Sequence, residues 1–420
     1  MSRLHPISGC VQHYAWGRPG SSSPLVRRVW EAQSGSPDAD GDARNYAEIW
    51  LGTHGSGPSV LGAAGGGGRT LLSLIEASPA LHLGSAPQPN QAAPNLPFLL
   101  KLLSIHKVLS IQSHPDLKLA KELHERNPAV YKDGCHKPEM AIALTEFTAM
   151  CGFRPLGAIV AHLELYPELA SFVDAAAVED LKWAYERTKG LVGFDQSTNK
   201  ALKGLFSSFM SSFDASGREP LAAMISRLAA IPEPERTPLD SLLLSFAAQF
   251  PGDCGVFSPL LLQVHELSPG QSLFVPANTP HAYVSGEIVE CMARSDNVIR
   301  CGLTPKFKDV EVLCDSLTYE VAGAGAGGEG EETGEGRLYR PPVADFEVRV
   351  AEVEEGGSRT FAAVDSAAVL LVLEGGCEVE AGGEREELGF GQALFISANT
   401  RVEIKGGCKV VRALRNLGEL

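Results

Sequence analysis

A polar stripe runs through the segment LSIQSHPD, which spans residues 109–116. If this segment is a strand, its side chains alternate between two faces, so Ser110, Gln112 and His114 share one face while Leu109 and Ile111 share the other. A metal ion would satisfy an amide oxygen and an imidazole nitrogen together in an otherwise apolar interior. A strand that presents its polar face to water is the alternative, and the segment alone does not decide.

Two further segments supply side chains of the metal-ligand type. The segment YKDGCHKPEMAIAL places His136, Lys137 and Glu139 where a loop enters an apolar strand. The phrase VPANTPHAY places His281 after a turn that is bounded by prolines. Each segment is weak by itself, because charged turns are common on protein surfaces and a lone histidine is more often structural.

Together, Gln112, His114, Glu139 and His281 provide two imidazoles, one carboxylate and one amide oxygen. Such a set with an open coordination position is typical of catalytic zinc, whereas closed structural sites favour thiolates. The nine cysteines are scattered singly without a C-x-x-C pair, so we expect reduced thiols rather than disulfides or a thiolate site. Zinc with one carboxylate keeps a net positive charge, which would stabilise an oxyanion on a substrate.

Cationic side chains accompany these ligand candidates. Lys101 interrupts the apolar run LPFLLKL, where a buried ammonium needs a partner or a polar cavity. Lys137 adjoins the candidate ligand loop, and Arg300 follows Asp296 in SDNVIRCGLTPKF. Arginine and lysine are the usual partners of a phosphate group, although Arg300 and Asp296 would equally suit a surface ion pair.

A repeated phrase indicates two related β-domains. GQSLFVPANTPH at residues 270–281 returns as GQALFISANTRV at residues 391–402, with seven of the twelve letters matching in place. Val402 stands in the second copy where the first has His281, so we expect one β-barrel that carries the functional site and one that has only a structural role. Chance similarity between two β corners is the alternative, and two copies are too few for a solenoid.

Hydrophobic periodicity divides the rest of the chain. Short apolar runs between glycines and prolines predict strands over about the first 150 residues and again after Pro251, whereas three- and four-residue steps between about 156 and 250 predict helices. We therefore expect an α+β protein with two β jelly-roll domains and an inserted all-helical domain. The predicted divisions are 1–154 plus 255–322 (catalytic jelly roll), 155–254 (helical), 323–336 (a Gly/Glu-rich linker) and 337–420 (a second jelly roll without metal ligands).

Charge and composition restrict the partners. The 420 residues carry a formal net charge of -15, which disfavours nucleic acid or an anionic membrane, whereas a small anionic substrate suits a pocket that gathers a few cations. No apolar run approaches the roughly 18 residues of a membrane span. The N-terminus lacks the apolar region of a secretory signal, so we expect a cytoplasmic protein.

These phrases resemble those of the type I phosphomannose isomerases, zinc enzymes of the cupin superfamily. The resemblance covers nearly the whole chain and rests on QHYAWG, YAEIWLGTH, LSIQSHPD, HKPEMAIAL, CGFRP, VPANTPHAY and SDNVIRCGLTPKF. It implies cupin-like jelly rolls, an inserted helical domain, and one Zn²⁺ per chain on Gln112, His114, Glu139 and His281. It also implies a substrate site lined by Trp16, Ser110, Lys137, Asp296 and Arg300.

The implied reaction interconverts mannose 6-phosphate and fructose 6-phosphate through an enediol(ate), and would supply mannose for GDP-mannose and glycan synthesis. Zinc would balance the oxygen charge, while Arg300 and Lys137 with Ser110 would hold the phosphate or the developing charge. Asp296, Lys137 and His136 are the candidate bases, and Lys101 and Trp16 are expected at the substrate site. We expect a monomer that binds this small sugar phosphate.

Two other classes stay open at this point. Non-haem iron oxygenases also use two histidines and a carboxylate, and a non-catalytic cupin would bind mannose 6-phosphate without converting it. One residue departs from the family pattern, because Cys135 stands where the ligand loop of the family typically has Asn. A thiol beside the site predicts sensitivity to oxidants.

Overall fold

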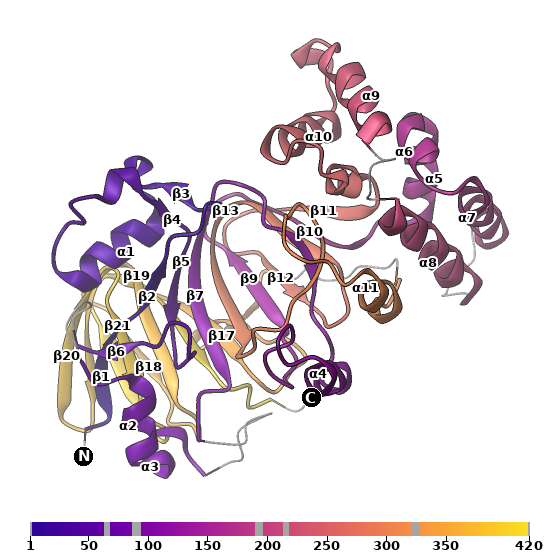
Figure 1. Ribbon diagram of the computed structural model, residues 1–420. Coiled ribbons are helices and arrows are strands. Elements are labelled where there is room, and N and C mark those ends of the chain that lie inside the picture. Colours follow the sequence, from indigo (N-terminus) through magenta and orange to yellow (C-terminus); the bar gives the residue numbers. More distant parts are fainter. Residues whose placement is uncertain are drawn as a thin grey trace.

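The computed structural model describes residues 2–62, 68–85, 94–189, 196–212, 218–320 and 328–418. They form two large antiparallel sheets, called here the N-terminal and C-terminal sheets, and a separate group of helices (Figure 1). Over these ranges, no helix combines the length and the apolar character that crossing a membrane requires. The predicted α+β class is confirmed.

The N-terminal sheet is organised around one long strand. Its main path runs β11-β10-β13-β7-β5-β2, and four more strands attach beside it. The ten strands are β2 (Cys10–Gln12), β5 (Glu48–Leu51), β7 (Phe98–Ile105), β8 (Ile111–Ser113), β9 (Glu139–Ala143), β10 (Phe147–Phe153), β11 (Leu262–Leu267), β12 (Ser272–Val275), β13 (His281–Ala293) and β14 (Ile299–Gly302). Two short strands, β3 (Arg18–Pro19) and β4 (Asn45–Tyr46), pair separately.

Strand β13 connects two layers of this sheet. Its first residues pair with β8 and β10, and its later residues pair with β7 and β9. Gly286 lies at the change of partners with a φ of 124°, and a Cβ there would meet the Glu146 carbonyl oxygen at 2.7 Å. This conformation favours glycine. A compact apolar core that includes Leu103, Ala141 and Tyr283 lies between the strands.

The helices are inserted between two neighbouring strands. β10 and β11 pair with each other, yet six α-helices in the described ranges separate them in the sequence and form the group at the upper right of Figure 1. They are α5 (Leu156–Leu165), α6 (Pro167–Phe172), α7 (Ala175–Thr188), α8 (Gln196–Ser211), α9 (Arg218–Ala229) and α10 (Pro238–Gln249). Phe206, Phe209 and Phe246 are fully buried in their core, which confirms the helical periodicity.

The C-terminal sheet repeats this organisation. Its long strand β19 pairs first with β21 and β23, and after Gly375 with β20 and β22. An apolar core, called here the C-terminal core, lies between these strands and contains Leu370, Val402 and Val410. The strands are β15 (Glu331–Thr333), β16 (Gly336–Tyr339), β17 (Glu347–Val353), β18 (Ser358–Phe361), β19 (Ala368–Ala381), β20 (Glu384–Gly389), β21 (Ala393–Ile396), β22 (Val402–Lys405) and β23 (Cys408–Leu414).

Two strands from the beginning of the chain complete the C-terminal sheet. β1 (Leu4–Ser8) pairs with β21, and β6 (Val60–Leu61) pairs with β1. Figure 1 shows the indigo N-terminal strand beside the yellow C-terminal strands. Residues inside the range 1–154 that was predicted for the first domain therefore belong to the second sheet by their hydrogen bonds.

The repeated phrase has the same local structure in both copies. Asn278 and Asn399 both adopt a left-handed backbone, with φ of 58° and 57°. In each copy the glutamine of the Gly-Gln pair accepts a hydrogen bond from the backbone N–H three residues earlier. β13 begins at His281 and β22 begins at Val402, so these residues hold equivalent positions. The predicted common corner is confirmed.

Four helices lie where short strands and loops were predicted, and a fifth, α11 (Val310–Ser316), follows β14. They are α1 (Leu25–Ser34), α2 (Leu71–Ala77), α3 (Pro79–Leu83) and α4 (Leu117–Arg126). Each has ten residues or fewer, so it offers few turns of periodicity to recognise. Helix α1 is fixed by packing, because Leu25, Val26 and Val29 are buried.

The second half of the predicted linker at 323–336 forms a β-hairpin instead of a linker. Residues 323–327 lie outside the described ranges, whereas Glu331–Thr333 form β15 and pair with β16. An ion pair between Glu332 and Arg337 and a hydrogen bond from Thr333 to Gly336 support this hairpin. Pairing across the turn supplies the contacts that composition alone does not reveal.

Candidate metal centre

Strand pairing brings the ligand candidates together. Gln112 on β8 lies directly opposite both His281 on β13 and Arg300 on β14. Opposite residues of antiparallel strands place their side chains on one face, so these three side chains share a face. His114 follows β8 directly, and Glu139 is the first residue of β9.

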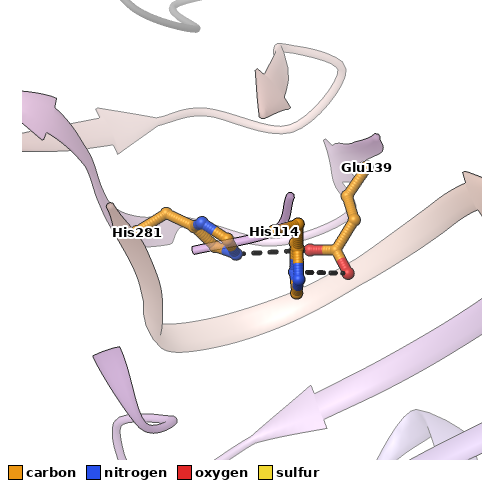
Figure 2. Close-up of side chains that lie close together, drawn as sticks. All are labelled: His114, Glu139 and His281. Atoms are coloured by element: carbon orange, nitrogen blue, oxygen red, sulfur yellow. Dashed lines mark ion pairs between the residues drawn. The ribbon is translucent and has the colours of Figure 1, made fainter. Parts of the chain in front are cut away.

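His114, Glu139 and His281 form a compact buried group (Figure 2). His114 Nε2 lies 3.2 Å from Glu139 Oε1, and His281 Nε2 lies 3.4 Å from Glu139 Oε2. Their candidate ligand atoms all lie within 4.8 Å of one another, and each of the three residues is at most 3% exposed. Residues from three separate strand regions thus converge as the sequence predicted.

Backbone carbonyls orient both imidazole rings. His114 Nδ1 lies 2.8 Å from the Asn297 carbonyl oxygen, and His281 Nδ1 lies 3.0 Å from the Thr279 carbonyl oxygen. A carbonyl oxygen only accepts, so each Nδ1 donates a proton to it and each Nε2 points toward the Glu139 carboxylate.

Burial sets the charge state of the group. Desolvation lowers the pKa of His114 to about 4, with the Lys137 ammonium acting in the same direction. Burial alone would raise the pKa of Glu139, but Lys137 and the two imidazoles together hold it well below its ordinary value. Lys137 Nζ lies 3.1 Å from Glu139 Oε1. The His114 imidazole is therefore neutral and the Glu139 carboxylate ionised at neutral pH.

The geometry fits a bound cation. Within the described part of the chain, His114 Nε2 and His281 Nε2 are buried without a hydrogen-bond partner, and they face carboxylate oxygens that also carry lone pairs. Such an arrangement is unfavourable unless a positive charge lies among these atoms. Two imidazoles and one carboxylate, with the Gln112 amide on the same face, form a donor set that suits zinc.

A second feature beside this group is an arginine that faces a cavity. Arg300 donates a hydrogen bond from Nη1 to Ser110 Oγ at 3.1 Å, and burial lowers its pKa. A cavity of about 370 Å³ is lined by Arg300, Asp296 and Lys306, among others. Among the described residues, no carboxylate forms an ion pair with Arg300. An anionic group of a substrate would therefore find an uncompensated guanidinium here.

The suggested ion pair between Arg300 and Asp296 is wrong. Asp296 Oδ1 instead lies 3.3 Å from His54 Nε2, and this hydrogen bond is the main cause that lowers the pKa of Asp296. Asp296 is therefore an ionised carboxylate at the rim of the same cavity. His54 was not among the predicted site residues, although it lies in the quoted phrase YAEIWLGTH.

The remaining predicted residues are engaged with protein groups. Lys101 Nζ lies 2.9 Å from Glu290 Oε2 and 3.7 Å from Glu48 Oε2, so its buried charge has partners. Burial alone would lower the pKa of Lys101, but these carboxylates raise it. His136 Nε2 lies 2.9 Å from Asp345 Oδ2, and Trp16 packs beside the core of the N-terminal sheet.

Sequence reasoning missed a polar clamp behind the group. The Asp133 carboxylate accepts hydrogen bonds from the backbone N–H groups of Cys135 and Asp296 and from the Ser295 hydroxyl. The Asn297 side chain donates to the same carboxylate and to two backbone carbonyls of this loop. These bonds tie the loop that leads to Glu139 to the loop that leads to Arg300. Lys306, in the quoted phrase SDNVIRCGLTPKF, was also missed.

Cys135 is half-buried, and the nine cysteines, all within the described ranges, form no disulfide with one another. Desolvation raises the pKa of the Cys135 thiol, with Asp133 acting in the same direction. A protonated thiol is a poor nucleophile, so this environment argues against the oxidant sensitivity expected from the sequence.

Fold and site together define a class of antiparallel β-proteins that hold a metal ion with side chains from neighbouring strands. The family models for type I phosphomannose isomerase match its catalytic domain at residues 4–156, its helical insertion domain at 173–262 and its C-terminal part at 337–384. The chain is 38% identical to human mannose-6-phosphate isomerase, with 96% of this chain and 95% of the relative covered. Mannose-6-phosphate isomerase 1 of Arabidopsis thaliana is 37% identical, covering 96% and 91%.

Solved structures agree with these relatives. A zinc-bound mannose 6-phosphate isomerase aligns with a TM-score of 0.81 at 28% identity, covering 99% of this chain and 100% of that one. A variant of phosphomannose isomerase from Salmonella typhimurium aligns with the same TM-score at 27% identity and the same coverage. The chain belongs to the type I phosphomannose isomerase family.

Proposed function

We propose that this chain is a zinc-dependent isomerase that interconverts mannose 6-phosphate and fructose 6-phosphate through an enediol(ate). The observation that carries the proposal is the pair of buried Nε2 atoms of His114 and His281, which face Glu139 and have no hydrogen-bond partner among the residues described, while Arg300, opposite Gln112, lines a cavity. The names of the relatives and the zinc-bound structure support the same activity.

One zinc ion per chain would be held by Gln112, His114, Glu139 and His281. When bound, zinc supplies a positive charge that stabilises negative charge on the oxygens of a sugar. Lys137 adds a second positive charge beside Glu139. These two positive charges would stabilise the enediolate that forms when a proton leaves C1 or C2.

Arg300 and Ser110 hold the phosphate in this proposal, with Lys306 across the same cavity. The Arg300 guanidinium is already oriented by Ser110, so little side-chain freedom is lost when an anion binds. Lys101, which was expected to contact substrate, has its charge balanced by Glu290 and Glu48, and we assign it to the electrostatic balance around the site instead.

Asp296 is our candidate for the base that moves the proton between C1 and C2. It is ionised, because its hydrogen bond with His54 lowers its pKa, and it lines the cavity with Arg300. Neither of the other two candidates is among the residues that line this cavity, and Lys137 contacts Glu139 while His136 contacts Asp345. A general base must have a free oxygen or nitrogen within reach of the proton it removes.

The proposal also includes the predicted jelly-roll domains and their boundaries. The common corner that leads into β13 and β22, and the long strand that changes partners in each sheet, support two cupin-like jelly rolls, divided at the predicted boundaries except where β1 and β6 join the second sheet. A monomeric state, a cytoplasmic location, the absence of nucleic-acid partners and a supply role for GDP-mannose stay predictions.

A coupled assay tests the activity. Purified protein is given mannose 6-phosphate, and fructose 6-phosphate is measured before chelation, after chelation and after zinc is returned. We expect activity to disappear with the metal and to return with zinc. Binding without conversion would contradict the isomerase and favour a sugar-binding protein, and oxygen consumption that depends on iron would favour an oxygenase.

A further inference from the structure

An arginine is buried in the C-terminal core at the level where the repeat has lost its histidine. Arg412 is 1% exposed and lies on the face of β23 that also carries Val410 and Leu414, both members of that core. Its Cζ lies 4.9 Å from the ring centroid of Phe361, which is the cross-strand partner of Val402. Val402 is the counterpart of His281.

Two of the three guanidinium nitrogens of this arginine make no hydrogen bond within the described ranges. Arg412 Nε and Nη1 are buried without a hydrogen-bond partner among the described residues, and the nearest carboxylate oxygen, Glu335 Oε2, is 3.9 Å from Nη1. Burial lowers the pKa of Arg412 to about 10, and the neighbouring Arg349 acts in the same direction. A buried guanidinium normally has acceptors on several N–H bonds.

The surrounding charges leave an excess of cations. Glu347, which is fully buried, accepts hydrogen bonds from Arg340 and Arg349. Glu335 forms an ion pair with Arg349 and accepts a hydrogen bond from the Ala362 backbone N–H at 2.8 Å. Three guanidinium groups therefore face two carboxylates, and Arg412 is the one that lacks a close partner.

The Glu335 carboxylate lies near both Arg349 and Arg412. Glu335 lies in the short turn between β15 and β16, with its side chain partly exposed. Its carboxylate is the group that approaches both Arg349 and Arg412 from the surface side of the core. A carboxylate contributed by a surface turn is the kind of group that a free anion replaces, because both make the same charge-assisted hydrogen bonds.

We propose that this end of the C-terminal core is a binding site for a small oxyanion, built on Arg412 and Arg349 and covered by Glu335. The first copy of the repeat gathers anionic and neutral ligands for a cation, and the second copy presents cations for an anion. Phosphate and carboxylate groups share the required chemistry. The site is separate from the cavity that Arg300 lines.

Calorimetric titration of the zinc-loaded full chain tests this site, with inorganic phosphate and acetate in separate arms. All proteins carry Arg300→Ala, which weakens binding at the substrate cavity. Glu335→Gln should raise the affinity for one of the two anions at least tenfold, whereas Glu332→Gln on the neighbouring strand should leave it unchanged. Adding Arg412→Met to Glu335→Gln should remove the gain.

Equal titration curves for Glu335→Gln with and without Arg412→Met would overturn the proposal. If Arg412→Met fails to fold, crystals of the Glu335→Gln variant soaked in selenate give the answer. An anomalous selenium peak within hydrogen-bond distance of Arg412 supports the site, and its absence at a concentration that labels the Arg300 cavity of the unmodified chain refutes it.

Discussion

Arg300 is oriented by a single protein hydrogen bond, to Ser110, and within the described ranges it forms no ion pair. If Arg300 holds the substrate phosphate, Arg300→Ala should lower kcat/KM for mannose 6-phosphate about 30- to 1000-fold. This factor corresponds to a loss of about 2–4 kcal/mol of transition-state stabilisation. Zinc content should not change. Lys107→Ala, which removes an exposed positive charge, is the control. A normal kcat/KM for Arg300→Ala would show that the phosphate binds elsewhere.

Asp133 acts through other residues, because it accepts hydrogen bonds from both loops that carry the site. Asn297, one of its partners, offers the carbonyl that orients His114. Loss of such supporting contacts weakens metal binding by roughly 10- to 100-fold. Asp133→Ala should therefore raise the zinc dissociation constant by that factor in a chelator competition, while the exposed neighbour Lys132→Ala should not. An unchanged zinc affinity would show that the hydrogen bonds to the Asp133 carboxylate do not support metal binding.

At the scale of elements, helix α3 is attached to the C-terminal sheet through a titratable group. His82 Nδ1 lies 2.9 Å from Ser397 Oγ, and its ring packs against His5 and Phe395. Desolvation lowers the pKa of His82 to about 4, with His5 and Arg3 acting in the same direction. The unfolded chain therefore takes up a proton near pH 6.5 that the folded chain still excludes.

The free energy of unfolding should consequently fall as the pH drops from about 6.5 toward 4. Above pH 6.5, the neutral His82 should make its full contribution to that free energy. His82→Gln, which keeps a polar group for Ser397, should flatten the decline. Urea unfolding at several pH values measures the free energy. The same pH slope in both proteins would assign the acid sensitivity to other groups.

Strand β1 carries a side chain into a core made by the other end of the chain. Leu4 is 2% exposed and packs with Leu394 and Leu414. Leu4→Ala should lower the free energy of unfolding by about 2–4 kcal/mol, as for other buried leucines. Pro6→Ala, at an exposed position of the same strand, should change it by less than about 1 kcal/mol. Equal effects in denaturant unfolding would contradict the packing role of Leu4.

At the scale of the whole molecule, metal binding should be visible as stability. The folded chain gathers the ligand atoms from β8, β9 and β13, and the unfolded chain does not. Zinc at 100 times its dissociation constant should add about 2.7 kcal/mol. The Tm of chelated protein should therefore rise with free zinc, whereas magnesium, which prefers all-oxygen ligands, should leave it unchanged. A zinc-independent Tm would contradict the buried site.

The sequence predicted the ligand group better than its surroundings. His114, Glu139 and His281 were recognisable because imidazole and carboxylate groups beside apolar strands imply a shared task, and the common turn was visible as repeated letters. The contact between His54 and Asp296 and the ion pairs of Lys101 were not, because they depend on the register of strands far apart in the chain. The short helices were missed for lack of periodicity.

The pairing of β1 with β21 also has a consequence during translation. The ribosome releases β1 long before its hydrogen-bonding partner exists, so the nascent strand waits with unsatisfied backbone groups while hundreds of later residues emerge. Exposed strand edges promote association with other chains, and this sheet closes only when a strand made late in translation reaches one made early. A chain that is cut short before β21 therefore keeps β1 without this partner, and its exposed edge favours aggregation.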